Sequence, residues 1–199
     1  MSEAISKQSV KSVIQSLDES ARQQRLIDIN IDALSEGLSL LALLNVEQYQ
    51  QGYKPIFQST LGTHYRHILE HYRCFFSQLA VFKFRYDKRE RDQELEVNID
   101  YAKQTIEDII QQFVNFDMAL FTKKYTVAEE QSDAYLVDDV ESTLERELMF
   151  LQSHTVHHFA MIAAMSRGQG VSPDESFGVA IPTQNYTRSL DMNTSFESK

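Results

Sequence analysis

The stretch Leu144-Glu-Arg-Glu-Leu-Met-Phe-Leu-Gln-Ser-His154-Thr-Val-His-His158-Phe-Ala-Met-Ile-Ala-Ala-Met165 decides the fold. Apolar residues and two histidines recur in it at steps of three and four, which is the period of one helix face. A helix is therefore predicted from Asp139 or Ser142 to Met165, and Arg167 and Gly168 are residues typical of a helix C-terminus. Its core stripe consists of Leu144, Leu148, Leu151, His154, His158, Ile162 and Met165.

The two stripe histidines lie one helical turn apart, so their imidazoles point towards the same place. Neutral imidazole is the commonest protein ligand for a transition metal, and His154 with His158 would supply half of a tetrahedral site. Burying two imidazoles without partners costs about 1–3 kcal/mol each, and a shared metal ion removes that cost. The alternative is a pair of buried polar side chains that bond to backbone or to each other. His157 points to one side and is expected to support or pack beside the pair.

Three more helices are predicted from similar stripes, over residues 29–51, 59–79 and 97–116. A shorter lead-in helix is expected within 2–24, and Gly52 and Pro55 open a loop before the second helix.

Strand-like and irregular segments are confined to two regions. The helical period breaks over 118–137, where a short hairpin is predicted. After Gly168 the chain is polar, and the tail 169–199 is expected to pack partly through Phe177, Val179 and Ile181. Four helices without alternating strands indicate an all-α, four-helix bundle. The length favours a single domain over 1–199, with a core over about 29–168.

Composition and charge exclude several classes of function. A net charge of −10 opposes binding to nucleic acid, and the basic stretch 83–91 contains acidic residues, so it is expected to be a solvated loop. The longest apolar run, 38–44, is too short to span a membrane, and the N-terminus has no signal-peptide pattern. Cys74 is the only cysteine, which excludes an intrachain disulfide; it is expected in the core of a cytoplasmic protein.

A second histidine cluster, His64, His67 and His71, offers a third ligand. The apolar face of the second helix places His64 and His71 at its edge and His67 further round, so periodicity favours His64 or His71. Glu147 lies two turns before His154 on the same face. Its role could be that of a general base, of a hydrogen-bond partner of a ligand, or of one half of an exposed ion pair with Arg146. No phosphate-binding loop, serine-nucleophile elbow or Cys-x-x-Cys motif is present.

Two motifs resemble the DinB-like family of metal-binding four-helix bundles. The first, Gly62-Thr-His-Tyr-Arg-His67, matches the family's glycine followed five positions later by histidine, and the second is His154-Thr-Val-His157-His158. The connection 86–92 and the segment Phe177-Gly-Val-Ala180 are similar to one uncharacterised branch of the family. The resemblance spans about 34–181 and implies that the ligands are His67, His154 and His158. The family's frequent His-Arg-Gly-Gln is replaced by His158-Phe-Ala-Met, so the substrates of those relatives do not carry over.

The resemblance implies a metal-dependent hydrolase or thiol S-transferase. Three imidazoles would hold a divalent ion and leave a position for water or a substrate thiolate. Zn or Ni is the expected ion, and Fe is the next candidate. An iron-dependent sulfoxide synthase needs a second, larger domain for which this chain has no room. The alternative function is a non-catalytic metal-binding or interaction bundle, and the resemblance implies a homodimer.

Overall fold

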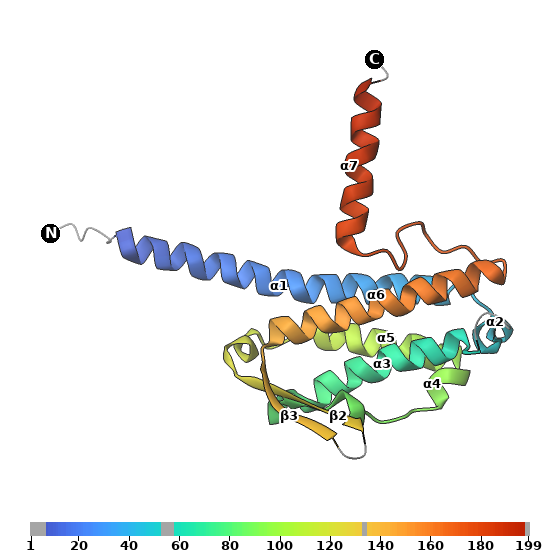
Figure 1. The fold of residues 1–199 in the computed structure, drawn as a ribbon, viewed down its shortest axis with the longest axis horizontal. Coiled ribbons are helices and arrows are strands. Elements are labelled where there is room, and N and C mark those ends of the chain that lie inside the picture. The colour runs from blue at the N-terminus through green and yellow to red at the C-terminus, as the bar shows by residue number, and fades with distance from the viewer. Residues whose placement is uncertain (1–6, 53–57, 133–134, 198–199) are drawn as a thin grey trace.

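The computed structural model describes residues 7–52, 58–132 and 135–197, and these are mostly helical with one small sheet (Figure 1). The long helices of the body are α1 (Lys7–Leu41), α3 (Leu61–Gln78), α5 (Ile99–Val114) and α6 (Leu144–Gly168). Helices α1 and α3 each contact both α5 and α6, so their apolar faces enclose one core. The prediction of a mostly helical protein is confirmed. In the described part of the chain, no helix has the length and apolarity needed to cross a membrane.

The first predicted helix differs from the structure at both ends. The lead-in and the core helix form one continuous helix, α1, because neither Gly nor Pro separates them. Residues 2–6 of the expected lead-in lie outside the described residues. At the other end α1 stops at Leu41, and a short helix, α2 (Val46–Gln50), begins. The side chain of Asn45 accepts a hydrogen bond from the Gln48 backbone N–H, while Gln48 caps in return. This capping box starts a new helix where periodicity alone predicts continuation.

A buried polar network joins α1, α3 and α6 at the centre of the core. The fully buried Asn30 donates from Nδ2 to the carbonyl oxygens of Leu26, at 2.8 Å, and Leu148, at 3.2 Å. Its Oδ1 accepts from the Tyr72 hydroxyl at 2.8 Å, and the Thr155 hydroxyl lies 3.2 Å from Tyr72 Oη. Asn30 therefore bonds to α6 through Nδ2 and to α3 through Oδ1, and this fixes how α6 lies against α1 and α3.

Asn30→Ala is expected to lower the free energy of unfolding by about 3 kcal/mol, because it leaves the Leu148 carbonyl and the Tyr72 hydroxyl buried with fewer partners. Urea denaturation measures this loss. Ser35→Ala is the matched control on α1, since Ser35 is exposed and bonds only within its own helix. It is expected to change stability by less than about 0.5 kcal/mol. Equal stabilities of the two variants would show that the network contributes nothing.

The segment before α6 forms the predicted hairpin. Strand β2 (Tyr125–Ser132) pairs antiparallel with β3 (Tyr135–Ser142), and residues 133–134 at its tip lie outside the described residues. The hairpin starts later than predicted, because Met118–Thr122 is a 3₁₀ helix, η3. Strand β3 reaches Ser142, so the start of α6 at Asp139 is wrong; Thr143 caps the helix by accepting from the Arg146 backbone N–H. A two-residue strand, β1 (Lys83–Phe84), adds a parallel third member next to β2 and was not predicted.

The remaining elements are short or peripheral. A 3₁₀ turn, η1 (Leu79–Val81), ends α3; another, η2 (Tyr86–Lys88), and a helical turn, α4 (Glu94–Val97), lead from β1 to α5. The tail packs through Phe177, whose ring stacks on that of Phe159 with centroids 4.5 Å apart. Ile181 is 40% exposed, contrary to the prediction, because it begins a further helix, α7 (Ile181–Glu197), that stands away from the body (Figure 1). Residues 198–199 of the predicted tail lie outside the described residues.

Candidate metal centre

The two histidine clusters meet between α3 and α6. Helix α3 carries His64, His67 and His71, and α6 carries His154 and His158, along the line where the two helices are in contact. The rings of His67 and His154 have centroids 4.9 Å apart. His158 flanks this pair on one side, with its ring 4.6 Å from that of His67, and His71 flanks it on the other, with its ring 4.3 Å from that of His154.

Two ring nitrogens lie at ligand-like spacing from His154 Nε2. His154 Nε2 lies 3.1 Å from His67 Nε2 and 3.2 Å from His158 Nε2. A tetrahedral ion with metal–nitrogen distances of about 2.0–2.1 Å holds its ligand nitrogens about 3.3 Å apart. One ring nitrogen has either one N–H or one lone pair, so His154 Nε2 cannot make two good hydrogen bonds at once, whereas a bound cation would need only its lone pair. The residues present therefore fit a divalent ion.

The same cluster includes a fourth imidazole. Ligand nitrogens of His67, His71 and His154 all lie within 4.8 Å of one another. His158 adjoins this group, since its Nε2 lies 3.2 Å from that of His154.

Burial keeps these imidazoles in the neutral form that binds metals. It lowers the pKa of His67 to about 2, of His71 and His158 to about 3 and of His154 to about 4, each below the ordinary value of 6.5. Neighbouring histidines and, for several of them, Arg89 add to the shift, because a cation next to another cation is unfavourable. At neutral pH each ring therefore carries one lone pair, and the outer hydrogen bonds decide which ring nitrogen holds it.

The outer hydrogen bonds distinguish the rings. His71 Nδ1 donates to the His67 backbone oxygen at 2.6 Å, which leaves its Nε2 with a lone pair. His158 Nδ1 lies 2.9 Å from His64 Nδ1, and His64 Nε2 lies 2.8 Å from Ser59 Oγ. If His64 donates to Ser59, its Nδ1 accepts from His158, and His158 Nε2 then faces the centre with its lone pair. His64 is therefore placed behind a ligand rather than among the ligands.

His67 has a different outer partner, Arg89. The guanidinium of Arg89 donates from Nη2 to His67 Nδ1 at 3.1 Å, so in this state the proton of the neutral ring is on Nε2. Metal binding through His67 Nε2 therefore requires that proton to leave. The nitrogen spacing favours His67 as the third ligand, whereas the outer hydrogen bonds favour His71.

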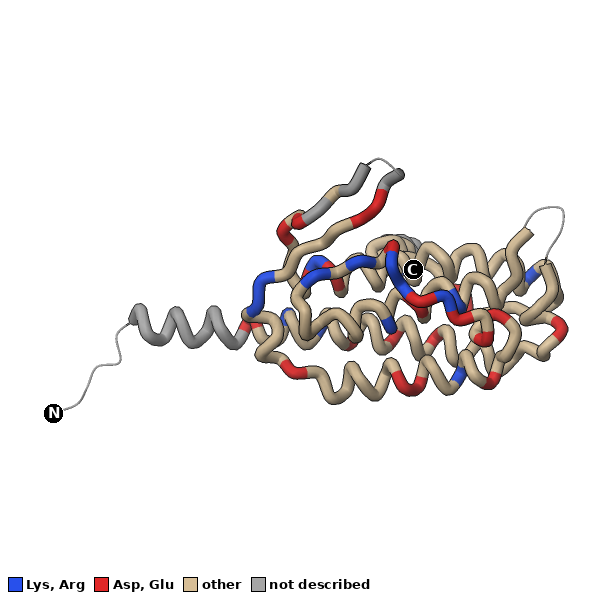
Figure 2. Tube along the Cα trace, turned by 90° about the horizontal axis from the view of Figure 1, so that it is seen from below, with Lys and Arg blue, Asp and Glu red and all other residues tan. Residues whose placement is uncertain are grey.

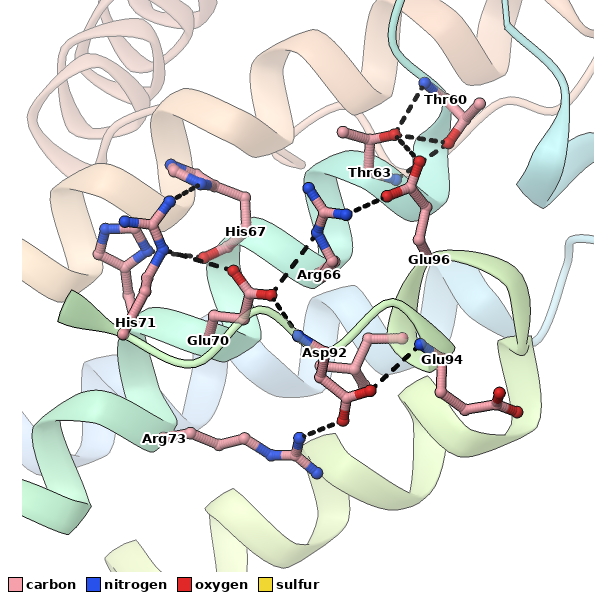
Figure 3. A network of polar contacts seen from close by, with 12 residues as sticks. Thr60, Thr63, Arg66, His67, Glu70, His71, Arg73, Asp92, Glu94 and Glu96 are labelled. Carbon is pink, nitrogen blue, oxygen red and sulfur yellow. Dashed lines mark hydrogen bonds and ion pairs between the residues drawn. The ribbon is translucent and has the colours of Figure 1, made fainter. Parts of the chain in front are cut away.

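A buried carboxylate holds Arg89 in place. Glu70 of α3 is 2% exposed; its Oε2 lies 3.4 Å from Arg89 Nε, and its Oε1 accepts from the Asp92 backbone N–H at 2.9 Å. Glu70 Oε1 also lies 3.6 Å from Arg66 Nε, and Arg66 pairs with Glu96 of α4 (Figure 3). These contacts draw the connection between η2 and α4 onto the outer side of α3, next to the histidines.

The expectation that residues 83–91 form a solvated loop is wrong for Arg85 and Arg89, whereas Arg91 is exposed. The side chain of Arg89 is 9% exposed and that of Arg85 is 24% exposed. Figure 2 shows that the basic residues of this part of the chain alternate with acidic ones along one face of the body. The alternation predicts ion pairing, but the sequence has no signal that the partner of Arg89 is a buried glutamate on α3.

The other residues selected from the sequence lie around the centre. His157 is exposed, and its ring centroid is 5.3 Å from that of His158. The interpretation of Glu147 as an exposed partner of Arg146 is wrong: Glu147 is 4% exposed and accepts hydrogen bonds from Tyr86 and Ser142. Cys74 is buried as expected, and burial raises the pKa of its thiol to about 11. Sequence reasoning missed Tyr86, whose ring stacks on that of His71.

A scan against models of protein families finds no match to this chain, and a search of curated proteins finds no similar sequence. The fold and the site define a mostly helical protein with a histidine cluster between two of its helices. The DinB-like resemblance rests on the motifs quoted above.

Proposed function

We propose that this chain is a DinB-like four-helix bundle, formed by α1, α3, α5 and α6, and that it is a metal-dependent enzyme. The observation that carries the proposal is that the Nε2 atoms of His67 and His158 lie 3.1 Å and 3.2 Å from that of His154. The ion would be Zn or Ni, with Fe as a further candidate, since imidazole ligands suit all three.

The three proposed ligands come from two helices whose relative position is fixed by the core. His154 and His158 follow one another by a turn on α6, and His67 projects from α3. All three rings are half-buried, so an ion held by them would keep a side accessible to a small molecule. Bound there, a divalent ion supplies Lewis acidity that lowers the pKa of a bound water or thiol. This chemistry supports a hydrolase or a thiol S-transferase.

The other residues of the centre would orient and protect the ligands. His64 Nδ1 is hydrogen-bonded to His158 Nδ1, and the backbone oxygen of His67 accepts from His71. Phe150 stacks on the His154 ring with centroids 5.5 Å apart, and Tyr86 stacks on the His71 ring. These aromatic rings exclude water from the end of the cluster formed by His71 and His154.

Elemental analysis of the native protein tests the proposal directly. About one divalent ion per chain is expected in protein purified without chelator or metal-affinity resin. His67→Ala is expected to lose the ion and His71→Ala to retain it, because the Nε2 atom of His67 has ligand spacing to His154. Loss of the ion in His71→Ala with retention in His67→Ala would instead identify His71 as the third ligand. Native protein without metal would contradict the proposal.

A second candidate function is suggested by the position of His71. With its Nδ1 bonded to the His67 backbone oxygen, its Nε2 is available as a fourth ligand. Four imidazoles would close the coordination shell, and the site would then serve stability or metal sensing in a bundle that associates with a second copy. Cobalt substitution separates the two functions. A spectrum that shifts on addition of a small thiol supports the enzyme, and an unresponsive one supports the closed site.

A further inference from the structure

Glu147 is a buried carboxylate without a cationic partner. Its Oε2 accepts from the Tyr86 hydroxyl at 2.9 Å, and its Oε1 accepts from the Ser142 hydroxyl at 2.5 Å. Both partners are neutral, and in the described part of the chain no Lys, Arg or His nitrogen lies within ion-pair distance of Glu147. Buried carboxylates are ordinarily paired with a cation, since desolvation of an isolated charge is costly.

The carboxylate lines a cavity of about 340 Å³ between the hairpin and the first two turns of α6. Three valines, Val127, Val137 and Val140, form the wall on the hairpin side. Two aromatic rings, Tyr86 and Phe150, stand next to Glu147, with centroids 5.1 Å apart. A cavity of this size accepts a small organic molecule with an apolar portion.

The charges around the cavity are mainly negative. Glu129 and Glu141 line it in addition to Glu147, and Arg146 is the one basic side chain among the residues that line it. Arg146 is exposed and does not reach Glu147. The lining therefore has an excess of two negative charges, which attracts cations and repels anions.

We propose that this cavity binds a small organic ammonium ion with an apolar substituent. The ammonium group would pair with Glu147 beside the rings of Tyr86 and Phe150, which attract a nearby cation. The apolar substituent would contact Val127, Val137 and Val140 on the hairpin. A ligand that carries a free carboxylate or phosphate would be repelled from this cavity by the negative charge of Glu147.

The cavity adjoins the histidine cluster but does not depend on it. Tyr86 contacts Glu147 through its hydroxyl and His71 through its ring, at a centroid distance of 5.6 Å, and the ring of Phe150 stacks on that of His154. These two aromatic side chains separate the cavity from the rings of His71 and His154. Binding of an ammonium ion is consequently expected in metal-free protein as well as in metal-loaded protein. The ammonium site and the metal centre can therefore be tested independently of each other.

Calorimetric titration with phenethylamine tests the proposal, with 2-phenylethanol and 3-phenylpropionate as neutral and anionic probes of similar shape. Phenethylamine is expected to bind one site at least about tenfold more tightly than either, because the charge–charge contact and the cation–π contact are lost without the ammonium. The titrations are made on chelator-treated full-length protein and repeated after loading with Zn. Equal affinity for the three probes, or no saturable binding of phenethylamine, overturns the proposal.

Two variants locate the site. Glu147→Gln is expected to weaken phenethylamine binding about tenfold or more, since the amide retains the shape without the charge. Its matched control, Glu107→Gln, removes the same charge from an exposed position on α5 and is expected to leave binding unchanged. Val140→Phe keeps Glu147 and fills the cavity from a half-exposed strand position, so it keeps the test valid if Glu147→Gln does not fold. Unchanged binding in Val140→Phe would place the amine elsewhere and overturn the proposal.

Discussion

His154→Ala is expected to abolish metal binding. His154 is the central member of the cluster: its Nε2 is 3.1 Å from that of His67 and 3.2 Å from that of His158, and its ring is the nearest to His71. Any three-histidine group completed by either flanking ring includes it. Loss of an outer-shell partner weakens metal binding by roughly 10- to 100-fold, so removal of this ligand is expected to exceed that range.

Competition with a chromophoric chelator measures the affinity, and elemental analysis measures the content of the purified variant. His157→Ala is the matched control, because His157 is exposed on the same turn of α6 and its ring lies outside the cluster. It is expected to bind metal like the wild type. If His154→Ala retained wild-type affinity, the convergence of nitrogens would be a packing feature of neutral histidines and the proposed centre would not exist.

Gly62→Ala is expected to have a large effect on stability. A Cβ atom at position 62 would lie 2.0 Å from the carbonyl oxygen of Glu96 and 2.9 Å from Cε1 of Tyr49. The first contact is with backbone and cannot be relieved by rotating a side chain, so α4 would have to move away from α3. That movement would strain the hydrogen bond from the Tyr49 hydroxyl to the Leu95 oxygen and the contact of Thr63 with Glu96.

The expected loss is about 3 kcal/mol, at the upper end for overpacking, which lowers the melting temperature by about 10 °C for a chain of this size. Gly170→Ala provides the comparison. Gly170 has φ +79° and no atom within 4 Å of an added Cβ, so only the left-handed backbone opposes the substitution, at about 1 kcal/mol. Thermal unfolding of the two variants measures the difference. A loss in Gly62→Ala no larger than in Gly170→Ala would contradict the close approach of α3 and α4.

Local patterns predicted the long helices well because their information is local. The stripes of α3, α5 and α6 each repeat over several turns, and all three begin within about two residues of a predicted limit once Ser142 is taken as the start of α6. The hairpin was also predicted, from a break in the helical period. Where a local signal was weak, the prediction was wrong: Val46 continues the predicted stripe of the first core helix but is exposed, because Asn45 caps a new helix there.

Long-range pairing explains what was missed. Strand β1 has two residues and exists only because Lys83 and Phe84 meet Thr126 and Val127, more than forty positions later. Charged residues of the segment 83–91 are typical of solvent-exposed loops, yet Arg89 is buried because Glu70 and His67 lie beneath it. Glu147 is buried for a similar reason, since the hairpin and Tyr86 cover it.

The histidines show the division between sequence and tertiary structure most clearly. The sequence by itself determined a mostly helical chain with His154 and His158 one turn apart on a core stripe, because helical spacing depends only on neighbouring residues. It left His64, His67 and His71 as rivals, since three residues spread over two turns of one helix point in different directions. Only the packing of α3 against α6 separates them: it places both His67 and His71 beside His154, and it turns His64 towards the outer nitrogen of His158. The rotation of one helix against another depends on the whole core, and no local pattern contains it.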